Sequence, residues 1–569
     1  MKKEGTLRID EALGREICQR EGLQVLLTGD IERVGEVFQI TIRALDPVHS
    51  SLLFAERERF NRLDQFFDKA DVLAIKIRKD LGESLDHIQK NSRPLAKVTT
   101  TSIEALQLYS QASDAGDQGK NEQVSVLLKG ALELDPDFAM AHLRLGQHYS
   151  AAVGKNEKAM AELERAYGLR QGVTEREHYK IEAAYYALLE RYEDEAQSLD
   201  ILVSLYPDDE ESHLELAGAY RDIGKLDKAI VEVREVLRLN PAFAPAYRTL
   251  VLYLARTNQN EAAISAGREA QRRGVDTSQM YWGIGLAYLG VGDVAMARQA
   301  FDKTGQGTQT DRELRDLNLV IADLYEGKVE SARAALAAQI QAFSTGGDPL
   351  QTIRRSLMGR IHLSQGNPQK AVLEAHLIVT EPSTGLQTYD LLNAGTLYAR
   401  TGRINQARRV LRRMDESRRS VPSYWNQSCY HNLEGEIWLA AARPDEAEKS
   451  FTSASREYPQ VFSHAGLARA YEVQRRWKVA AQEWEQVLSR KGEVLQDGFP
   501  PDLTYAHIQA ARAYRTLDNR ALASSHYGDV FQMWQNADQL PLLKEVRREL
   551  HDVNVDKRIA VDRTTQEAH

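Results

Sequence analysis

The chain has 569 residues, a formal net charge of −9 and two cysteines, Cys18 and Cys429, that lie far apart. The mild acidic charge argues against a dedicated nucleic-acid binder, and the cysteine spacing indicates neither a disulfide framework nor a thiolate metal site. Hydrophobic residues make up 43% and only 15 residues are proline, so a mostly helical globular chain is expected.

The N-terminal part reads as a small α/β module. Residues 10–20 are amphipathic and predict a helix. Three apolar segments follow, and the alternation of apolar and polar residues over 38–44 is typical of strands. A second helix is expected over residues 62–81. The pattern predicts a module at 1–90, joined by a linker at 91–101 to the rest of the chain.

No segment predicts a membrane span or a secretory leader. The start, MKKEGTLRIDEALGREI, has positive charge but no apolar core, and the longest uncharged apolar stretch, Thr277–Gly292, is too short to cross a bilayer. As given, the chain is expected to be soluble and cytoplasmic, or periplasmic if it belongs to a membrane-anchored parent.

A repeat of 34 residues organises the chain beyond this module. Ala229, Ala263 and Ala297 are each separated by 34 positions, and Pro207 and Pro241 share that spacing. A period of 34 is typical of the tetratricopeptide repeat, in which each unit is a hairpin of two helices.

The residue types inside the repeat agree with its period. One unit places bulky, aliphatic, small and aromatic residues in the order Tyr281, Ile284, Gly285, Tyr288, Gly292, Ala297 and Phe301. This order resembles the tetratricopeptide signature. The resemblance implies a mostly α chain: an α-solenoid, or right-handed superhelix, of about twelve hairpins over 102–538. A capping helix is expected at 539–553 and a polar tail at 554–569.

Small residues recur where the axes of two helices must come close. Glycine or alanine there lets the helices pack, and bulky residues fill the space between neighbouring hairpins. The predicted packing positions are Gly146, Ala229, Ala263, Gly285, Ala297, Gly395, Ala407, Gly435 and Ala447.

A second resemblance involves the N-terminal part. The segments ALGREICQREGLQVLLTGDI, LDPVHSSLLFAERE and PLAKVTTTSIEALQLYS resemble large bacterial regulators over about residues 8–115. In those proteins a domain similar to the N-terminal domain of TolB precedes tetratricopeptide repeats. The composite often follows a serine/threonine kinase domain or a winged-helix DNA-binding domain. The expected first strand and helix of the TolB-like domain are missing here, so the resemblance implies a truncated module.

Motifs for chemistry are absent from the sequence. It contains no kinase motif set, phosphate-binding loop, Gly-x-Ser-x-Gly elbow, His-Glu-x-x-His or Cys-x-x-Cys. Gly283-x-Gly285 faintly resembles a dinucleotide loop but falls inside a repeat helix, where a packing role is the simpler interpretation. The histidines are scattered. We therefore predict a non-enzymatic protein with no catalytic residue, no cofactor and no metal.

The resemblance to tetratricopeptide proteins also predicts a binding groove, because the first helix of each hairpin lines a concave surface in that family. The groove positions in this register are Arg248, Trp282, Arg360, Asn432, Arg469, Arg512 and Arg515. Such a groove would suit an acidic peptide or a terminal carboxylate. The alternative is that these arginines are solvated or paired with Glu436, Glu472 and similar neighbours. The Lys/Asn clamp of chaperone-binding members is not matched.

Tryptophans gather late in the chain. Trp438 and Trp484 occupy packing positions, whereas Trp425, Trp477 and Trp534 fall near loops or helix ends and could anchor a partner. The sequence favours a protein-binding scaffold in bacterial regulation or signalling, with a protein or peptide partner. It leaves open a detached sensory part of a kinase or winged-helix regulator, and an unrecognised enzyme is the third and weakest interpretation.

Overall fold

The computed structural model describes residues 23–84, 99–153, 157–342, 350–380, 387–420, 423–497 and 499–566, with the single residues Glu11, Gly14, Arg15, Cys18 and Leu95. Most of the helix expected at residues 10–20, and much of the linker expected at 91–101, lie outside the described residues. The chain forms two compact units, residues 1–189 with 197–206, and residues 190–196 with 207–569.

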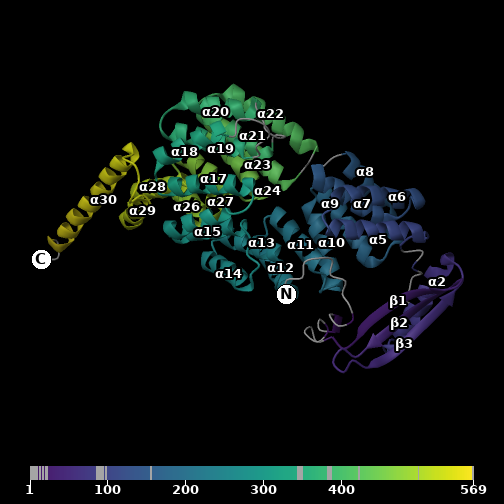
Figure 1. Cartoon of the computed structure of the whole chain (residues 1–569). Helices are drawn as coiled ribbons and strands as arrows, with labels where there is room; N and C mark the ends of the chain where they lie inside the picture. Colours follow the sequence, from purple (N-terminus) through teal and green to yellow (C-terminus); the bar gives the residue numbers. More distant parts are fainter. Residues whose placement is uncertain are drawn as a thin grey trace. The chain divides into compact units, whose positions relative to one another are not determined.

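The first unit begins with a three-stranded antiparallel sheet, as expected. Strands β1 (Leu26–Val34), β2 (Val37–Leu45) and β3 (Leu52–Phe60) pair in chain order. Helix α2 (Phe66–Asp80) lies along the sheet (Figure 1), where Leu73 packs with Ile40 and Phe60. The alternation of apolar residues predicted the strands because one face of the sheet is covered by this helix.

Helical pairs complete the first unit. Their helices are α5 (Ile103–Asp117), α6 (Asn121–Leu134), α7 (Ala139–Val153), α8 (Glu157–Leu169), α9 (Glu175–Leu188) and α10 (Tyr192–Leu205), the last of which begins in the other unit. Local signals begin several of them: Ser102 accepts a hydrogen bond from the Ala105 amide, and Thr174 and Glu177 form a capping box.

Nine further helix pairs build the described part of the second unit, each packing against the next. They are α11 (Glu210–Asp222) with α12 (Leu226–Leu239), α13 (Ala244–Arg256) with α14 (Asn260–Arg273), α15 (Met280–Val291) with α16 (Val294–Thr304), α17 (Gln309–Tyr325) with α18 (Val329–Ala342), α19 (Gln351–Ser364) with α20 (Pro368–Thr380), α21 (Thr388–Arg400) with α22 (Ile404–Ser420), α23 (Tyr424–Ala440) with α24 (Pro444–Glu457), α25 (Val461–Val473) with α26 (Trp477–Ser489), and α28 (Pro501–Thr516) with α29 (Arg520–Met533). The fold is therefore an α-solenoid of helix hairpins with a small N-terminal α/β module, as expected.

The small residues of the repeat lie at close helix contacts. The alanines at 229, 263, 297, 407 and 447 are all fully buried, with 0% of their surface exposed. A Cβ atom placed on Gly395 would lie 2.5 Å from Leu433, and one on Gly146 would lie 2.6 Å from Leu163. The same atom on Gly285 would meet the Phe301 ring. Larger residues at these glycines would push the contacting helices apart, which are α21 and α23 for Gly395 and the two helices of one hairpin for Gly146 and Gly285.

An extra helix, α27 (Lys491–Asp497), follows α26 and contacts much earlier hairpins. The Gly492 amide donates a hydrogen bond of 2.6 Å to Asn258, which is 234 residues earlier in the chain. Lys491 donates to the Tyr325 hydroxyl at 3.0 Å. Asp497 forms an ion pair with Arg256. The second unit therefore winds back on itself, and α27 covers the inner helices α13 and α15.

The last helix, α30 (Pro541–Gln566), is longer than expected. A capping helix ending at residue 553 and a polar tail were predicted, but the helix continues through residues 554–566. That segment contains no glycine or proline that would end a helix. The first part of α30 is the segment for which capping of the last hairpin was predicted. There Val546 and Val553 are buried against Tyr527 and Val530.

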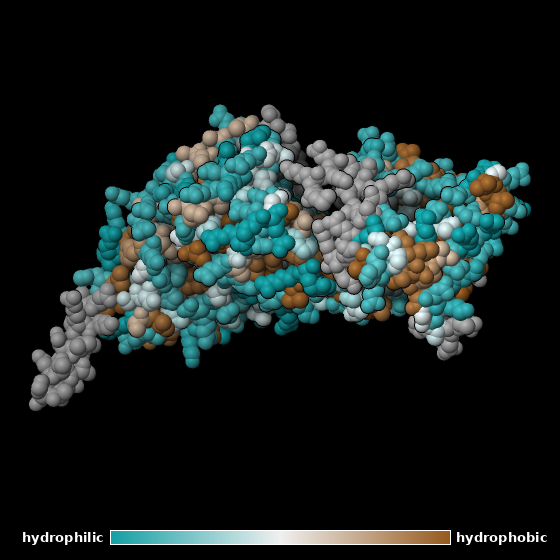
Figure 2. Space-filling model, turned by 60° about the horizontal axis from the view of Figure 1, so that its bottom comes forward, coloured by the Kyte–Doolittle hydropathy of each residue, from teal (hydrophilic) through white to brown (hydrophobic). Residues whose placement is uncertain are grey.

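None of the helices in the described ranges is both long and apolar enough to cross a bilayer. On the face drawn in Figure 2, hydrophilic residues predominate and hydrophobic residues occur in separate patches.

Candidate functional site

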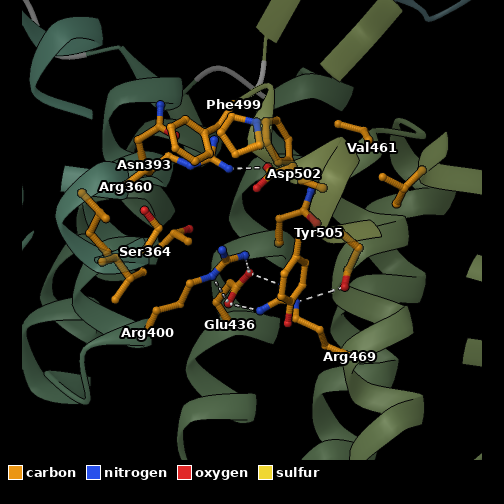
Figure 3. Close-up of a pocket in the computed structure, with 18 of the residues that line it drawn as sticks. Arg360, Ser364, Asn393, Arg400, Glu436, Val461, Arg469, Phe499, Asp502 and Tyr505 are labelled. Atoms are coloured by element: carbon orange, nitrogen blue, oxygen red, sulfur yellow. Dashed lines mark hydrogen bonds and ion pairs between the residues drawn. The ribbon is translucent and has the colours of Figure 1, made fainter. Parts of the chain in front are cut away.

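A cavity of about 410 Å³ lies in the second unit, between the first helices of consecutive hairpins. Helices α19, α21, α23, α25 and α28 contribute most of its wall (Figure 3). Further lining residues come from α24, α26 and α30, with Phe499 before α28 and Trp534 after α29. We call it the inner pocket. Most of the wall therefore comes from the first helices of the hairpins, the surface on which the repeat predicts a partner.

Most of the lining is apolar or aromatic. The apolar and aromatic residues are Leu363, Leu392, Leu397, Phe451, Val461, Phe462, Ala465, Trp484, Val487, Phe499, Pro501, Tyr505, Trp534 and Leu542. A concave, mostly apolar cavity with a few polar groups is the usual form of a ligand site.

One carboxylate organises the charged side of the pocket. Glu436 accepts hydrogen bonds from Arg400 at 2.8 and 3.2 Å and from Arg469 at 2.5 and 3.0 Å (Figure 3). Burial alone would raise the pKa of Glu436, but the charges and hydrogen bonds of the two arginines hold this pKa below its ordinary value. Glu436 is therefore ionised at neutral pH and fixes both guanidinium groups in place.

A second ion pair closes the pocket on the side of α28. Arg360 from α19 pairs with Asp502 from α28, and its guanidinium lies 4.6 Å from the centre of the Phe499 ring. The pair joins hairpins that are 142 residues apart in the chain. Phe499 and Asp502 follow α27, so this wall depends on the segment that leads away from the extra helix.

Two buried polar atoms of the lining have no hydrogen-bond partner. They are the Asn432 side-chain oxygen, on a residue with 2% of its surface exposed, and the Trp534 indole nitrogen, on a residue with 7% exposed. Leaving such an atom unpaired costs about 1–3 kcal/mol. The Asn432 oxygen is an acceptor and the Trp534 indole nitrogen is a donor.

The structure brings together three of the seven predicted groove residues. Arg360, Asn432 and Arg469 line the inner pocket. Arg469 pairs with Glu436, which is one of the alternatives that the sequence left open for these arginines, and Arg360 pairs with Asp502. Glu472, which the sequence offered as an arginine partner, instead accepts a hydrogen bond from the Trp484 indole at 2.7 Å.

The other four predicted groove residues lie outside the lining. Arg512 donates hydrogen bonds to Glu545 and Glu549, so its guanidinium group is already paired with carboxylates of the last helix, α30. Arg248 is exposed and donates to Gln279 at 2.6 Å. Arg515 is exposed, and Trp282 is half-buried.

Several lining residues escaped the sequence analysis. Arg400 is the last residue of α21 and is not among the seven predicted groove residues. Phe499, Asp502 and Tyr505 follow the α27 insertion, which interrupts the repeat register. Trp534 was predicted as a possible anchor near a helix end, and it does line the pocket.

Among the described residues, one group of ligating side chains lies close enough to share a metal ion. His507, His526 and Asp529 each offer an atom within 4.8 Å of the others. The sequence predicted no metal because no short motif joins these residues. Their ligating atoms come from two different helices, α28 and α29, and only the packing of the hairpin brings them together.

Comparisons with known proteins support the repeat assignment. Residues 210–243, which form α11 and α12, match the tetratricopeptide repeat family. The chain thus contains a tetratricopeptide repeat. No curated protein sequence matches the chain significantly.

Solved structures with a similar arrangement of helices include a chain of the APC/C hetero-tetramer Cut9–Hcn1, at 14% identity and a TM-score of 0.40, covering 86% of this chain and 84% of that one. Another is MamA, at 19% identity and a TM-score of 0.23, covering 29% of this chain and 94% of that one.

Proposed function

We propose that this protein is a non-catalytic scaffold that binds a peptide or protein partner in the inner pocket. The observation that carries the proposal is the pairing of an apolar cavity with two unsatisfied buried atoms, on Asn432 and Trp534. A catalytic role finds less support, because the charged groups of the pocket are held in ion pairs with one another.

The chemistry of the lining favours a particular kind of occupant. An apolar side chain would fill the space between Leu392, Phe462 and Tyr505. A peptide backbone offers both an N–H donor and a C=O acceptor, which match the Asn432 oxygen and the Trp534 nitrogen. Three arginines face two carboxylates in the lining, so one positive charge is left over and an acidic group on the partner would be tolerated.

Selection from a library of random displayed peptides on the full-length chain tests this proposal. We expect enriched peptides to share an apolar anchor residue and to lose binding to Thr396→Trp, which fills the pocket from α21. Leu373→Trp, on the outer helix α20 at a residue that is 53% exposed, is the matched control. Failure to enrich any peptide, or equal binding to both variants, would refute the proposal.

A second variant separates binding from folding. Asn432→Leu replaces an unsatisfied buried amide by an apolar group of similar size, so we expect stability to rise by about 1 kcal/mol while peptide affinity falls. A change of both quantities in the same direction would show that Asn432 acts in folding and not in recognition.

The regulatory context is a further part of the proposal. The resemblance of residues 8–115 to TolB-like regions of bacterial regulators supports a role in bacterial signalling, with the chain in the cytoplasm. The alternative is a sensory C-terminal part of a membrane-linked serine/threonine kinase or winged-helix regulator, which could place it in the periplasm. An in-frame kinase or winged-helix segment directly upstream would favour the alternative, and cell fractionation would separate the two locations.

A further inference from the structure

A histidine recurs at one position of the repeat and contacts a glutamate on the second helix of the same hairpin. In three hairpins the distance from the histidine Nδ1 atom to the carboxylate is 2.6 or 2.7 Å, and the two residues are 19 or 20 positions apart. The pairs are His142–Glu162, His213–Glu232 and His464–Glu483. Each gives the imidazole a negatively charged neighbour.

The hairpin of α28 and α29 breaks this pattern. His507 occupies the histidine position, but the residue 19 positions later is His526. The two Nδ1 atoms face each other at 3.0 Å, and a carboxylate oxygen of Asp529 lies 3.5 Å from Nδ1 of His507. Two imidazoles and one carboxylate therefore converge where the other three hairpins place a single imidazole and a single carboxylate.

Contacts on the far side of His526 determine where its proton lies. Its Nε2 atom is 3.0 Å from a carboxylate oxygen of Glu485, which also accepts a hydrogen bond of 3.0 Å from the Tyr514 hydroxyl. Because the carboxylate is an acceptor, Nε2 carries the hydrogen of the neutral ring. The Nδ1 atom of His526 then presents a lone pair toward His507 and Asp529.

We propose that His507, His526 and Asp529 bind one divalent transition-metal ion of the zinc class. Ligands at about 2.0–2.1 Å from a tetrahedral zinc ion lie about 3.3 Å from one another, and the distances of 3.0 and 3.5 Å fall on either side of this value. The hydrogen bond of His526 to Glu485 is the outer-shell contact that fixes a metal-binding histidine. Asp529 has 43% of its side chain exposed, so water can supply the fourth ligand.

The competing arrangement needs no metal. A proton on Nδ1 of His507 would donate to His526 or to Asp529, and the three side chains would form a hydrogen-bonded group inside the hairpin. The two arrangements differ in an observable way, because only the first takes up an ion with fixed stoichiometry.

The test uses the full-length chain without an added histidine tag, freed of metal by a chelator. We expect calorimetric titration with Zn²⁺ to show one site per chain, and Co²⁺ to give the absorption bands of tetrahedral coordination. His507→Gln and His526→Gln should each weaken Zn²⁺ binding at least tenfold, and Asp529→Asn should weaken it measurably. Glutamine at 526 keeps the hydrogen-bond donor to Glu485.

His464→Gln is the matched control, since it removes the histidine of an ordinary pair in α25 and α26. This variant should bind Zn²⁺ as the unmodified chain does. Absence of stoichiometric uptake, or uptake that none of the three ligand variants weakens, would overturn the proposal in favour of the hydrogen-bonded group. Because Asp529 is partly exposed, Asp529→Asn gives a result even where a histidine variant fails to fold.

Discussion

Replacing Gly435 by alanine tests the packing of the hairpins. A Cβ atom at this position would lie 2.7, 2.7 and 2.8 Å from three ring atoms of Phe451. The ring is 1% exposed and cannot swing into solvent. Overpacking of this kind costs about 1–3 kcal/mol, whereas alanine gains about 0.5–1 kcal/mol over glycine in a helix. The expected net loss of stability is therefore about 1–2 kcal/mol.

Gly218→Ala is the matched control, because a Cβ atom there meets no other atom within 4 Å. Only the gain in helix propensity remains, so this variant should become more stable by about 0.5–1 kcal/mol. Denaturant unfolding followed by circular dichroism measures both shifts. Hydrogen exchange over α23 and α24 locates the loss, since neighbouring hairpins of a solenoid can loosen separately. Stabilisation by Gly435→Ala would refute the reasoning.

Three other perturbations have defined outcomes. Gly395→Leu should cost about 2–3 kcal/mol by overpacking against Leu433, which thermal melting measures. Glu436→Gln leaves two guanidinium groups without their counter-charge and should cost about 2–3 kcal/mol at neutral pH, less than for a fully buried pair because Arg400 is 34% exposed. The pKa of Glu436 is lower in the folded chain than in the unfolded chain, where it is 4.5. The difference in stability between the unmodified chain and Glu436→Gln should therefore be complete above pH 4.5 and shrink as the pH falls through the folded pKa. Denaturant unfolding at a series of pH values from acid to neutral measures this difference. Burial raises the pKa of Cys429 to about 12, so alkylation followed by mass spectrometry should label it only as the hairpin unfolds.

Local sequence carried enough information to predict the hairpins. Two helices of a repeat are adjacent in the chain, so the small residue on one and the bulky residue on the other recur at fixed spacing. Gly435 in α23 and Phe451 in α24 illustrate this, since a Cβ atom on the glycine would lie 2.7 Å from the ring. The strands of the N-terminal module were predictable for the same reason, because Ile40 and its alternate neighbours face one helix.

The candidate site could not be predicted in full, because it is formed by contacts between residues whose separation in the chain does not follow the repeat. Arg469 was predicted in the groove, and its pairing with Glu436 was an alternative that the sequence could not decide. The contact between Asn258 and Gly492 spans 234 residues and depends on the pitch of the superhelix, which accumulates from small rotations between hairpins. The sequence did not predict the group of His507, His526 and Asp529 for a different reason. His526 stands where three other hairpins have a glutamate paired with a histidine, and those pairs can be recognised only from the distances between their atoms.

The extra helix α27 connects the shape of the second unit to its pocket. Asp497 at the end of α27 pairs with Arg256 and its backbone carbonyl accepts a hydrogen bond from Tyr389, so the segment is held by hairpins on both sides. Phe499, two residues later, lines the pocket beside Arg360 of α19. A change in superhelical pitch would therefore move Phe499 relative to Arg360. A partner that binds the pocket more tightly when the contacts of α27 are formed would stabilise those contacts. The stabilisation would equal the difference in binding free energy between the two forms of the unit. Under the proposed function, recognition of the partner and closure of the superhelix would be one equilibrium, because the same short segment would take part in both.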